Sequence, residues 1–132
     1  MIDLQIVPPQ TLGEMLAWGS AVITILFGLI CFFAPRITFN ILRLRTAEGV
    51  PEALSESRAT MAGFYLGVGI LAILLAQPFI WMVLGAGWFF TALGRLVSII
   101  FDRGNTQFNW ISIGMEAALA AGPLLYVFGY VG

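Results

Sequence analysis

The chain has 132 residues, of which 60% are apolar and 10% are charged, with a net charge of −1 and a mean hydropathy of +0.96. Soluble domains contain roughly 25% charged residues, so this composition excludes an ordinary soluble domain and predicts an integral membrane protein. The sequence has one cysteine, Cys31, and no histidine, which excludes an internal disulfide bond and argues against zinc sites, haem ligation by imidazole and His-based catalysis. We therefore expect no metal and no cofactor, and we expect the lipid bilayer rather than nucleic acid as the surroundings of the chain.

Four apolar stretches are each long enough for a helix to cross the hydrocarbon core of a bilayer, which is roughly 30 Å thick. They predict helices at about 12–34, 51–77, 79–102 and 109–131. No internal repeat and no low-complexity linker separates them. The fold class that we expect is therefore all-α, an integral membrane four-helix bundle that forms a single domain over residues 1–132.

The first predicted helix begins at Thr11 and Glu14, which have the spacing of a capping box. No basic residue precedes it, and this argues against a cleaved signal peptide. The helix should end near Pro35. In the next segment, residues 36–45, three arginines are mixed with apolar residues at helical spacing, which predicts a short segment that lies along the membrane interface.

The second predicted helix begins at Pro51, a residue that suits the first position of a helix. Glu56 and Arg58 lie in its opening turns, and we expect Arg58 to extend its guanidinium toward the membrane surface. Gly63 and Gly67 then form a GxxxG spacing, which is typical of close approach between two membrane helices. The second helix should therefore pack closely against a neighbour along this face.

The third and fourth predicted helices each contain a charged residue well inside the span. Arg95 lies seven residues before Asp102, near the end of the third helix, and Glu116 lies seven residues after Asn109, near the start of the fourth. Antiparallel neighbours therefore place Arg95 and Glu116 at the same depth, about 10 Å from the end of each span. An unpaired charge near mid-membrane costs about 2.5–3.5 kcal/mol, so the sequence predicts an ion pair between them.

Further polar residues are predicted to lie close to this pair. Ser98 and Asp102 fall on the same helical stripe as Arg95, and Glu56 can join the cluster from the second helix, with Arg58 as a further candidate member. Two interpretations of the cluster stay open. It is a structural clamp that fixes the register of the helices, or it is a site for a ligand, a proton or an ion.

A surface of small residues lies roughly opposite Glu116 on the fourth helix and consists of Gly114, Ala118 and Gly122. Small residues let helix backbones approach each other closely in a membrane, so this surface is predicted to contact another helix or another protein. Pro123, one residue further on, should kink the fourth helix and free the carbonyl of Leu119.

The arginines predict the orientation of the chain, because basic residues near the ends of spans are retained in the cytoplasm. Four arginines, Arg36, Arg43, Arg45 and Arg58, lie between the first two helices, and Arg103 lies between the last two. The opposite side has none. Both termini should therefore lie on the non-cytoplasmic side.

Three segments resemble a bacterial family of four-helix membrane proteins known as domain of unknown function 4345. They are SESRATMAG (55–63), ALGRLVSIIFDRG (92–104) and GMEAALA (114–120). The resemblance implies a multi-pass protein of the bacterial inner membrane. The chain departs from the family pattern at Ala62-Gly63, where two glycines are expected. The resemblance adds Gly94 to the predicted packing positions and implies that the family positions are Glu56, Arg58, Gly63, Gly94, Arg95, Asp102 and Glu116.

Neither the residues nor the resemblance specifies an activity. The small size and the surface of small residues favour a non-enzymatic accessory or scaffolding subunit that acts through helix–helix association, with a membrane-protein partner or as a homo-oligomer. The alternative is a binding protein or carrier for an amphiphile or anion, in which Arg95 meets the ligand. An enzyme is the least favoured, because no nucleophile–base pair or metal-ligand cluster is visible.

Overall fold

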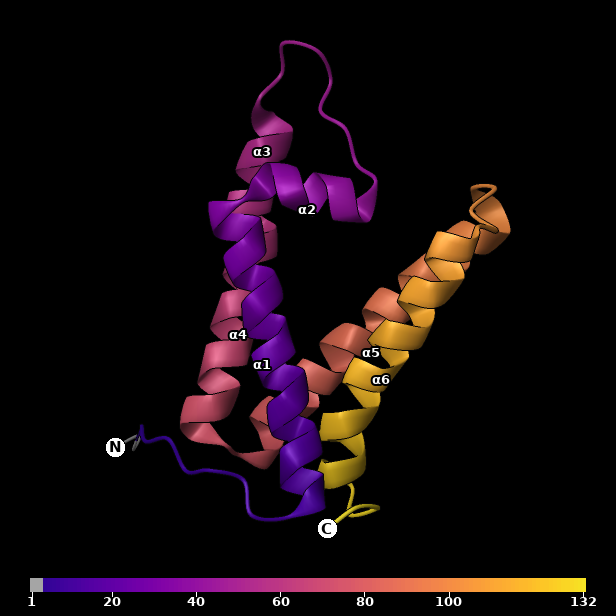
Figure 1. Cartoon of the computed structure of the whole chain (residues 1–132). Helices are drawn as coiled ribbons and strands as arrows, with labels where there is room; N and C mark the ends of the chain where they lie inside the picture. Colours follow the sequence, from indigo (N-terminus) through magenta and orange to yellow (C-terminus); the bar gives the residue numbers. More distant parts are fainter. Residues whose placement is uncertain (1–3) are drawn as a thin grey trace.

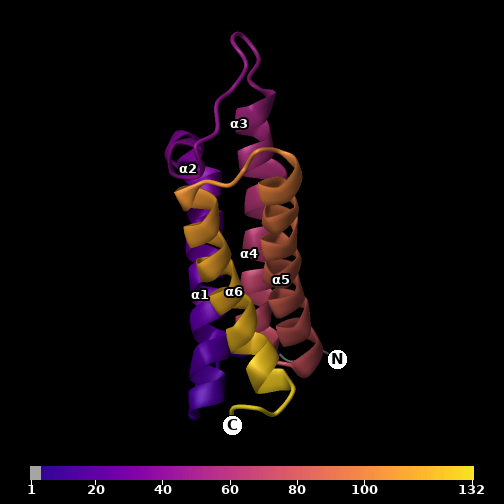
Figure 2. The same cartoon turned by 90° about the vertical axis from the view of Figure 1, so that its right-hand side faces the viewer.

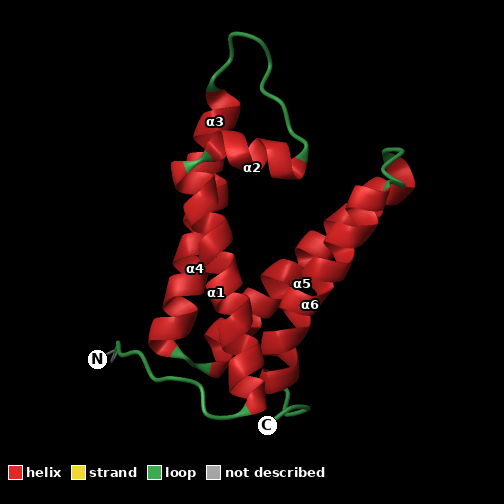
Figure 3. Cartoon of the chain, viewed as in Figure 1, coloured by secondary structure: helices red, strands yellow, loops and turns green. Residues whose placement is uncertain are grey.

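The computed structural model describes residues 4–132, and this part of the chain is helical, without strands (Figures 1 and 3). Four helical stretches are long and apolar enough to cross a membrane, which confirms the predicted all-α, multi-pass architecture. The last helix ends at Val127, earlier than predicted. The elements are α1 (Leu12–Phe33), α2 (Pro35–Leu42), α3 (Glu52–Glu56), the π-helical turn η1 (Ser57–Met61), α4 (Ala62–Leu75), α5 (Pro78–Phe101) and α6 (Gln107–Val127).

The long helices form two arms, one made of α1 and α4 and the other of α5 and α6. The arms meet at the end of the molecule that holds both termini, here called the terminal end, and diverge toward the end that holds α2, here called the α2 end (Figure 1). In the view turned by 90°, the same helices run nearly side by side (Figure 2). The molecule is therefore closed at one end and splayed at the other.

Small residues allow the helices to pack closely at the terminal end. Ala17 and Ala21 of α1 and Ala72 of α4 are fully buried, and a Cβ atom added to Gly69 would lie 3.2 Å from the backbone oxygen of Ala21. Trp81 of α5 is also buried in this core. Packing of this kind stabilises membrane helices, because the lipid offers no hydrophobic driving force for their association.

A chain of hydrogen bonds links α5, α1 and α6 beside this core. Pro123 has no N–H group, so the carbonyl of Leu119 lacks its usual partner within the helix. The hydroxyl of Ser20 donates to that carbonyl at 2.6 Å, and the hydroxyl of Thr24 donates to the carbonyl of Ser20 at 2.7 Å. Trp88 completes the chain by donating its indole N–H to Thr24 at 2.9 Å. The predicted release of the Leu119 carbonyl is confirmed, and a neighbouring helix satisfies it.

The second predicted helix is interrupted by η1, which joins it to the end of α1. In this turn Ser57 is fully buried and donates its hydroxyl to the carbonyl of Cys31 at 2.9 Å. Arg58 is exposed and donates to the carbonyl of Phe32 at 2.7 Å. The last carbonyls of a helix lack partners within that helix. Arg58 therefore caps α1.

The predicted interfacial segment forms α2, which runs across the end of α1 instead of continuing it (Figure 1). It begins at Pro35 and ends at Leu42, and the next residue, Arg43, has a φ of 59° in the left-handed region. This conformation lets the amide of Leu44 donate to the carbonyl of Phe39 at 2.8 Å, which closes the helix. The side chains of α2 are thereby directed across the open end of the molecule, where Thr38 lines the space between the arms.

Candidate functional site

The predicted pair between Arg95 and Glu116 is present, and it joins α5 to α6. The Nε and Nη2 atoms of Arg95 donate to the two carboxylate oxygens of Glu116 at 2.9 and 2.8 Å. The Glu116 side chain is 3% exposed and that of Arg95 is 22% exposed. Two parallel charge-assisted bonds of this kind are strong and fix the planes of both groups. Glu116 is therefore completely engaged by Arg95, whereas Arg95 keeps an accessible edge.

The loop between α5 and α6 orients this pair. The third nitrogen of Arg95, Nη1, donates to the side-chain oxygen of Asn109 at 3.0 Å, and the side-chain nitrogen of Asn109 donates to the carbonyl of Gly104 at 2.8 Å. Thr106 caps α6 by accepting from the amide of Asn109. An arginine has five N–H donors, of which these contacts use three. Two donors of Arg95 stay available.

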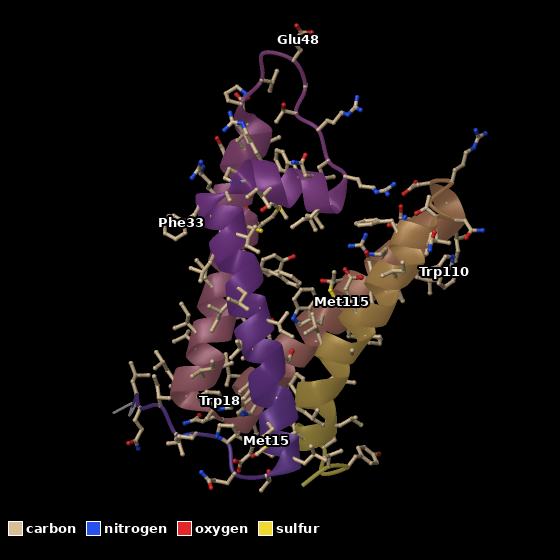
Figure 4. The ribbon with its side chains drawn as sticks, in the orientation of Figure 1. Met15, Trp18, Phe33, Glu48, Trp110 and Met115 are labelled. Atoms are coloured by element: carbon tan, nitrogen blue, oxygen red, sulfur yellow. The ribbon has the colours of Figure 1, made fainter. Side chains whose placement is uncertain are left out.

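A cavity of about 460 Å³ lies between the two arms, with Arg95 and Glu116 on its wall. This volume falls within the roughly 300–1,000 Å³ of small-molecule pockets. Figure 4 shows Met115, another lining residue, on the side of α6 that faces the α1/α4 arm, and Trp110 on the side that faces away. The divergence of the arms therefore creates a partly open cavity rather than a flat outer surface.

The end of the cavity nearest the terminal end is aromatic. Trp88 stacks on Tyr65 with ring centroids 5.6 Å apart and an interplanar angle of 12°, and Phe27 meets Trp88 edge-on at 6.0 Å. All three rings line the cavity. Because Trp88 is held by Thr24, this aromatic floor is continuous with the hydrogen-bonded core below it. The floor offers a rigid apolar surface.

The opposite end of the cavity is bounded by α2 and by the start of α6. Thr38, Ile41 and Leu42 present one face of α2 to the cavity. Arg43, which follows them, places its guanidinium carbon 5.5 Å from the centre of the Phe108 ring, and Arg95 approaches the same ring at 5.9 Å. Contacts of this type are attractive cation–π interactions. Phe108 therefore connects the buried pair to the arginine at the cavity mouth.

Not all predicted members of the polar cluster are in this site. Glu56 and Asp102 are exposed, and Ser98 acts through its backbone, because its carbonyl accepts from the amides of Asp102 and Gly104 at 2.9 and 3.2 Å. Arg58 is occupied at the end of α1. These four assignments to a common cluster are wrong, because Glu56, Arg58 and Asp102 are exposed and the side chain of Ser98 does not line the cavity.

Most predicted packing positions have no close neighbour within the chain: the assignments of Gly63, Gly67 and Gly94 are wrong, and contact of Gly114 and Ala118 with another protein stays a prediction. A Cβ atom added at the four glycines predicted to pack closely would contact nothing within 4 Å: Gly63, Gly67, Gly94 and Gly114. Ala118 is exposed as well. Gly122 differs, because a Cβ atom there would lie 2.7 Å from the backbone oxygen of Leu16 in α1. Residues spaced by four rotate about 40° per step around a helix, so the surface of small residues turns inward before it reaches Gly122.

Sequence reasoning missed the contribution of α2 and of two aromatic residues, Tyr65 and Phe108. A signal for α2 existed, because Thr38, Ile41 and Leu42 have the i, i+3, i+4 spacing of one helical face. The positions of Tyr65 and Phe108 depend on how the arms diverge. No local pattern specifies that divergence.

Fold and site together define a multi-pass helical membrane protein with an internal cavity that is aromatic at one end and polar on one wall. The chain belongs to the family described as a domain of unknown function (DUF4345), whose model matches residues 14–128. This confirms the resemblance seen in the sequence. No curated protein and no solved structure gave a significant match.

Proposed function

We propose that this protein binds one amphiphilic molecule in the cavity between its two arms. The observation that supports this proposal is the polarity gradient of the cavity, from the rings of Trp88 and Tyr65 at its floor to the Arg95–Glu116 pair on its wall. An apolar chain fits the floor, and a polar group fits the wall. The binding interpretation of the charged pair is thereby preferred to the purely structural one.

Two hydroxyl groups support the same proposal, because the fold gives neither a hydrogen-bond partner. Ser112 is 8% exposed and lines the cavity next to Glu116, and Tyr65, whose ring stacks on Trp88, lines it from α4. Among residues 4–132 no hydrogen bond is formed by either hydroxyl, and no fully buried side-chain oxygen lacks a partner. Both hydroxyls are therefore accessible, and a ligand with hydrogen-bonding groups would pair with them.

Binding, rather than chemical turnover, is the role that we propose. Glu116 is held by two donors of Arg95, and the neighbouring hydroxyl of Ser112 forms no hydrogen bond with it. An acid or base must be within hydrogen-bond reach of the group whose proton it moves. The cavity therefore suits a carrier or a ligand-dependent subunit.

The α2 end is proposed to face the cytoplasm of a bacterial inner membrane, since five arginines lie at that end and none at the other. The cavity would then open toward the inner leaflet. Fusions at Gly132 test this orientation. Alkaline phosphatase should be active there and green fluorescent protein dark, and the opposite pattern would show that the orientation is inverted.

Native mass spectrometry from a mild detergent tests the proposed binding. The wild-type protein should retain a single-chain amphiphile, and Ser112→Phe should lose it because the ring fills the cavity beside Glu116. Ala118→Leu is the matched control, since it adds bulk to an exposed position on the same helix. Equal retention by both variants would exclude the cavity as the binding site.

A second candidate function, association with a partner subunit or with another copy, has one supporting observation. Gly114 and Ala118 leave a smooth exposed surface on α6. Under this alternative, Ala118→Leu should abolish the oligomer or the co-purifying partner, while Ser112→Phe leaves it intact. The same two variants therefore distinguish the two functions.

A further inference from the structure

The cavity mouth has a cation that the fold leaves uncompensated. Arg43 lies at the end of α2, above the ring of Phe108. Within residues 4–132 the only ion pair is that between Arg95 and Glu116, so no carboxylate neutralises Arg43. The cluster around Phe108 contains Arg43, Arg95 and Glu116, and it therefore has an excess of one positive charge.

The available donors of Arg95 lie beside this excess charge. Glu116 occupies the Nε–Nη2 edge of the guanidinium and Asn109 accepts from Nη1, which leaves one N–H on each of Nη1 and Nη2. Arg95 also approaches the Phe108 ring, at 5.9 Å. Planar donor pairs of arginine suit the oxygens of carboxylates and phosphates.

We infer that the ligand is an anionic single-chain amphiphile whose headgroup lies between Arg43 and the free N–H groups of Arg95, with its alkyl chain on the floor formed by Trp88. This inference rests on the proposed function and adds the charge of the ligand and the role of Arg43. Glu116 lowers the charge of the deeper site, so Arg43 supplies the attraction for the headgroup. A carboxylate and a phosphate monoester share the required chemistry, and both are tested below.

The left-handed conformation of Arg43 determines the best variant for a test. Among uncharged residues with a side chain, asparagine tolerates this conformation best, so Arg43→Asn removes the charge while it preserves the end of α2. Arg36→Asn is the matched control, because it removes an equal charge from an exposed position of the same helix. Neither change alters the Arg95–Glu116 pair.

The experiment uses the full chain in nanodiscs of a zwitterionic lipid and follows quenching of tryptophan fluorescence by terminally brominated chains. A brominated fatty acid and a brominated alkyl phosphate are compared with the brominated alcohol of the same length. Trp88→Phe identifies the part of the signal that comes from the cavity floor. The anionic ligands should quench Trp88 at lower concentrations than the alcohol does. Arg43→Asn should weaken anion binding by at least about tenfold, and Arg36→Asn should not.

The outcomes separate the inference from the function on which it rests. If the alcohol binds as tightly as the acid and Arg43→Asn changes neither, the inference is overturned but amphiphile binding stands. If no brominated chain quenches Trp88, the proposed function fails together with the inference. Displacement of the acid by inorganic phosphate at equal concentration would show that a free anion is the ligand, which also overturns the inference. Unchanged binding of the alcohol to Arg43→Asn verifies that the variant keeps an intact cavity.

Discussion

The two ends of the bundle contain similar polar residues but use them differently. At the terminal end, Trp88, Thr24 and Ser20 are joined in one chain of hydrogen bonds that ends on the carbonyl of Leu119. At the α2 end, donors of Arg95 and the hydroxyl of Ser112 are directed into a cavity. Polar side chains therefore close the bundle where they satisfy one another and line a cavity where they do not.

The largest effect is expected from breaking the buried pair, on which the open end depends. Glu116→Ala and Arg95→Ala each leave one charge without its partner, and each should destabilise the protein by about 3–5 kcal/mol. The double variant should lose less than the sum of the two. The free energy of unfolding in mixed detergent measures these losses. Strictly additive losses would mean that the pair contributes nothing as a pair.

A smaller effect is expected from overpacking the closed end. Gly122→Ala places a methyl group against the backbone of Leu16, which cannot rotate away, and should destabilise the protein by about 1–3 kcal/mol. Gly114→Ala is the matched control on the same helix, because its Cβ atom meets open space. Thermal unfolding in detergent compares the two. Equal losses would show that the contact between α1 and α6 is looser than described.

The smallest effect is expected from a single hydrogen bond of the closed end. Ser20→Ala removes the donor to the carbonyl of Leu119 and should destabilise the protein by about 0.6–1.7 kcal/mol, as interhelical hydrogen bonds in membranes do.

Pro123→Ala provides the control for this bond, because it restores the N–H group that lies within reach of the Leu119 carbonyl. In that background, the loss caused by Ser20→Ala should be smaller than in the wild type. The free energies of unfolding of the two single variants and of the double variant measure the difference. If Ser20→Ala destabilises the Pro123→Ala variant as much as it destabilises the wild type, Ser20 does not donate to the carbonyl of Leu119.

The sequence was sufficient to predict the four spans, the pairing of Arg95 with Glu116 and the freed carbonyl of Leu119. Each of these depends on local rules: the length of an apolar run, equal depth in antiparallel helices, and the missing N–H of Pro123. The packing faces could not be predicted in the same way. An apolar helix has little asymmetry to show which side is buried, so the motif of Gly63 and Gly67 was assigned to an interface that Ala62, Gly69 and Ala72 occupy instead.

Only the charged pair of the site could be predicted from the sequence. Arg95 and Glu116 stand out because charges are rare inside spans. Arg43 does not, because arginines near the ends of spans are ordinary and its place above Phe108 follows from the direction of α2. Tertiary geometry, rather than residue type, distinguishes it from the other interfacial arginines.

The π-helical turn η1 has a consequence for insertions and deletions in this chain. A π turn contains about one residue more than an α turn, so η1 acts as a one-residue insertion at the start of the second span. Deletion of Ala59 would restore a regular α-helix and rotate everything before it by about 100° relative to α4. Ser57 and Arg58 would then point away from Cys31 and Phe32. The chain would keep a span long enough for the membrane but lose the bonds that hold the end of α1, so the exact length of this segment matters more than its composition.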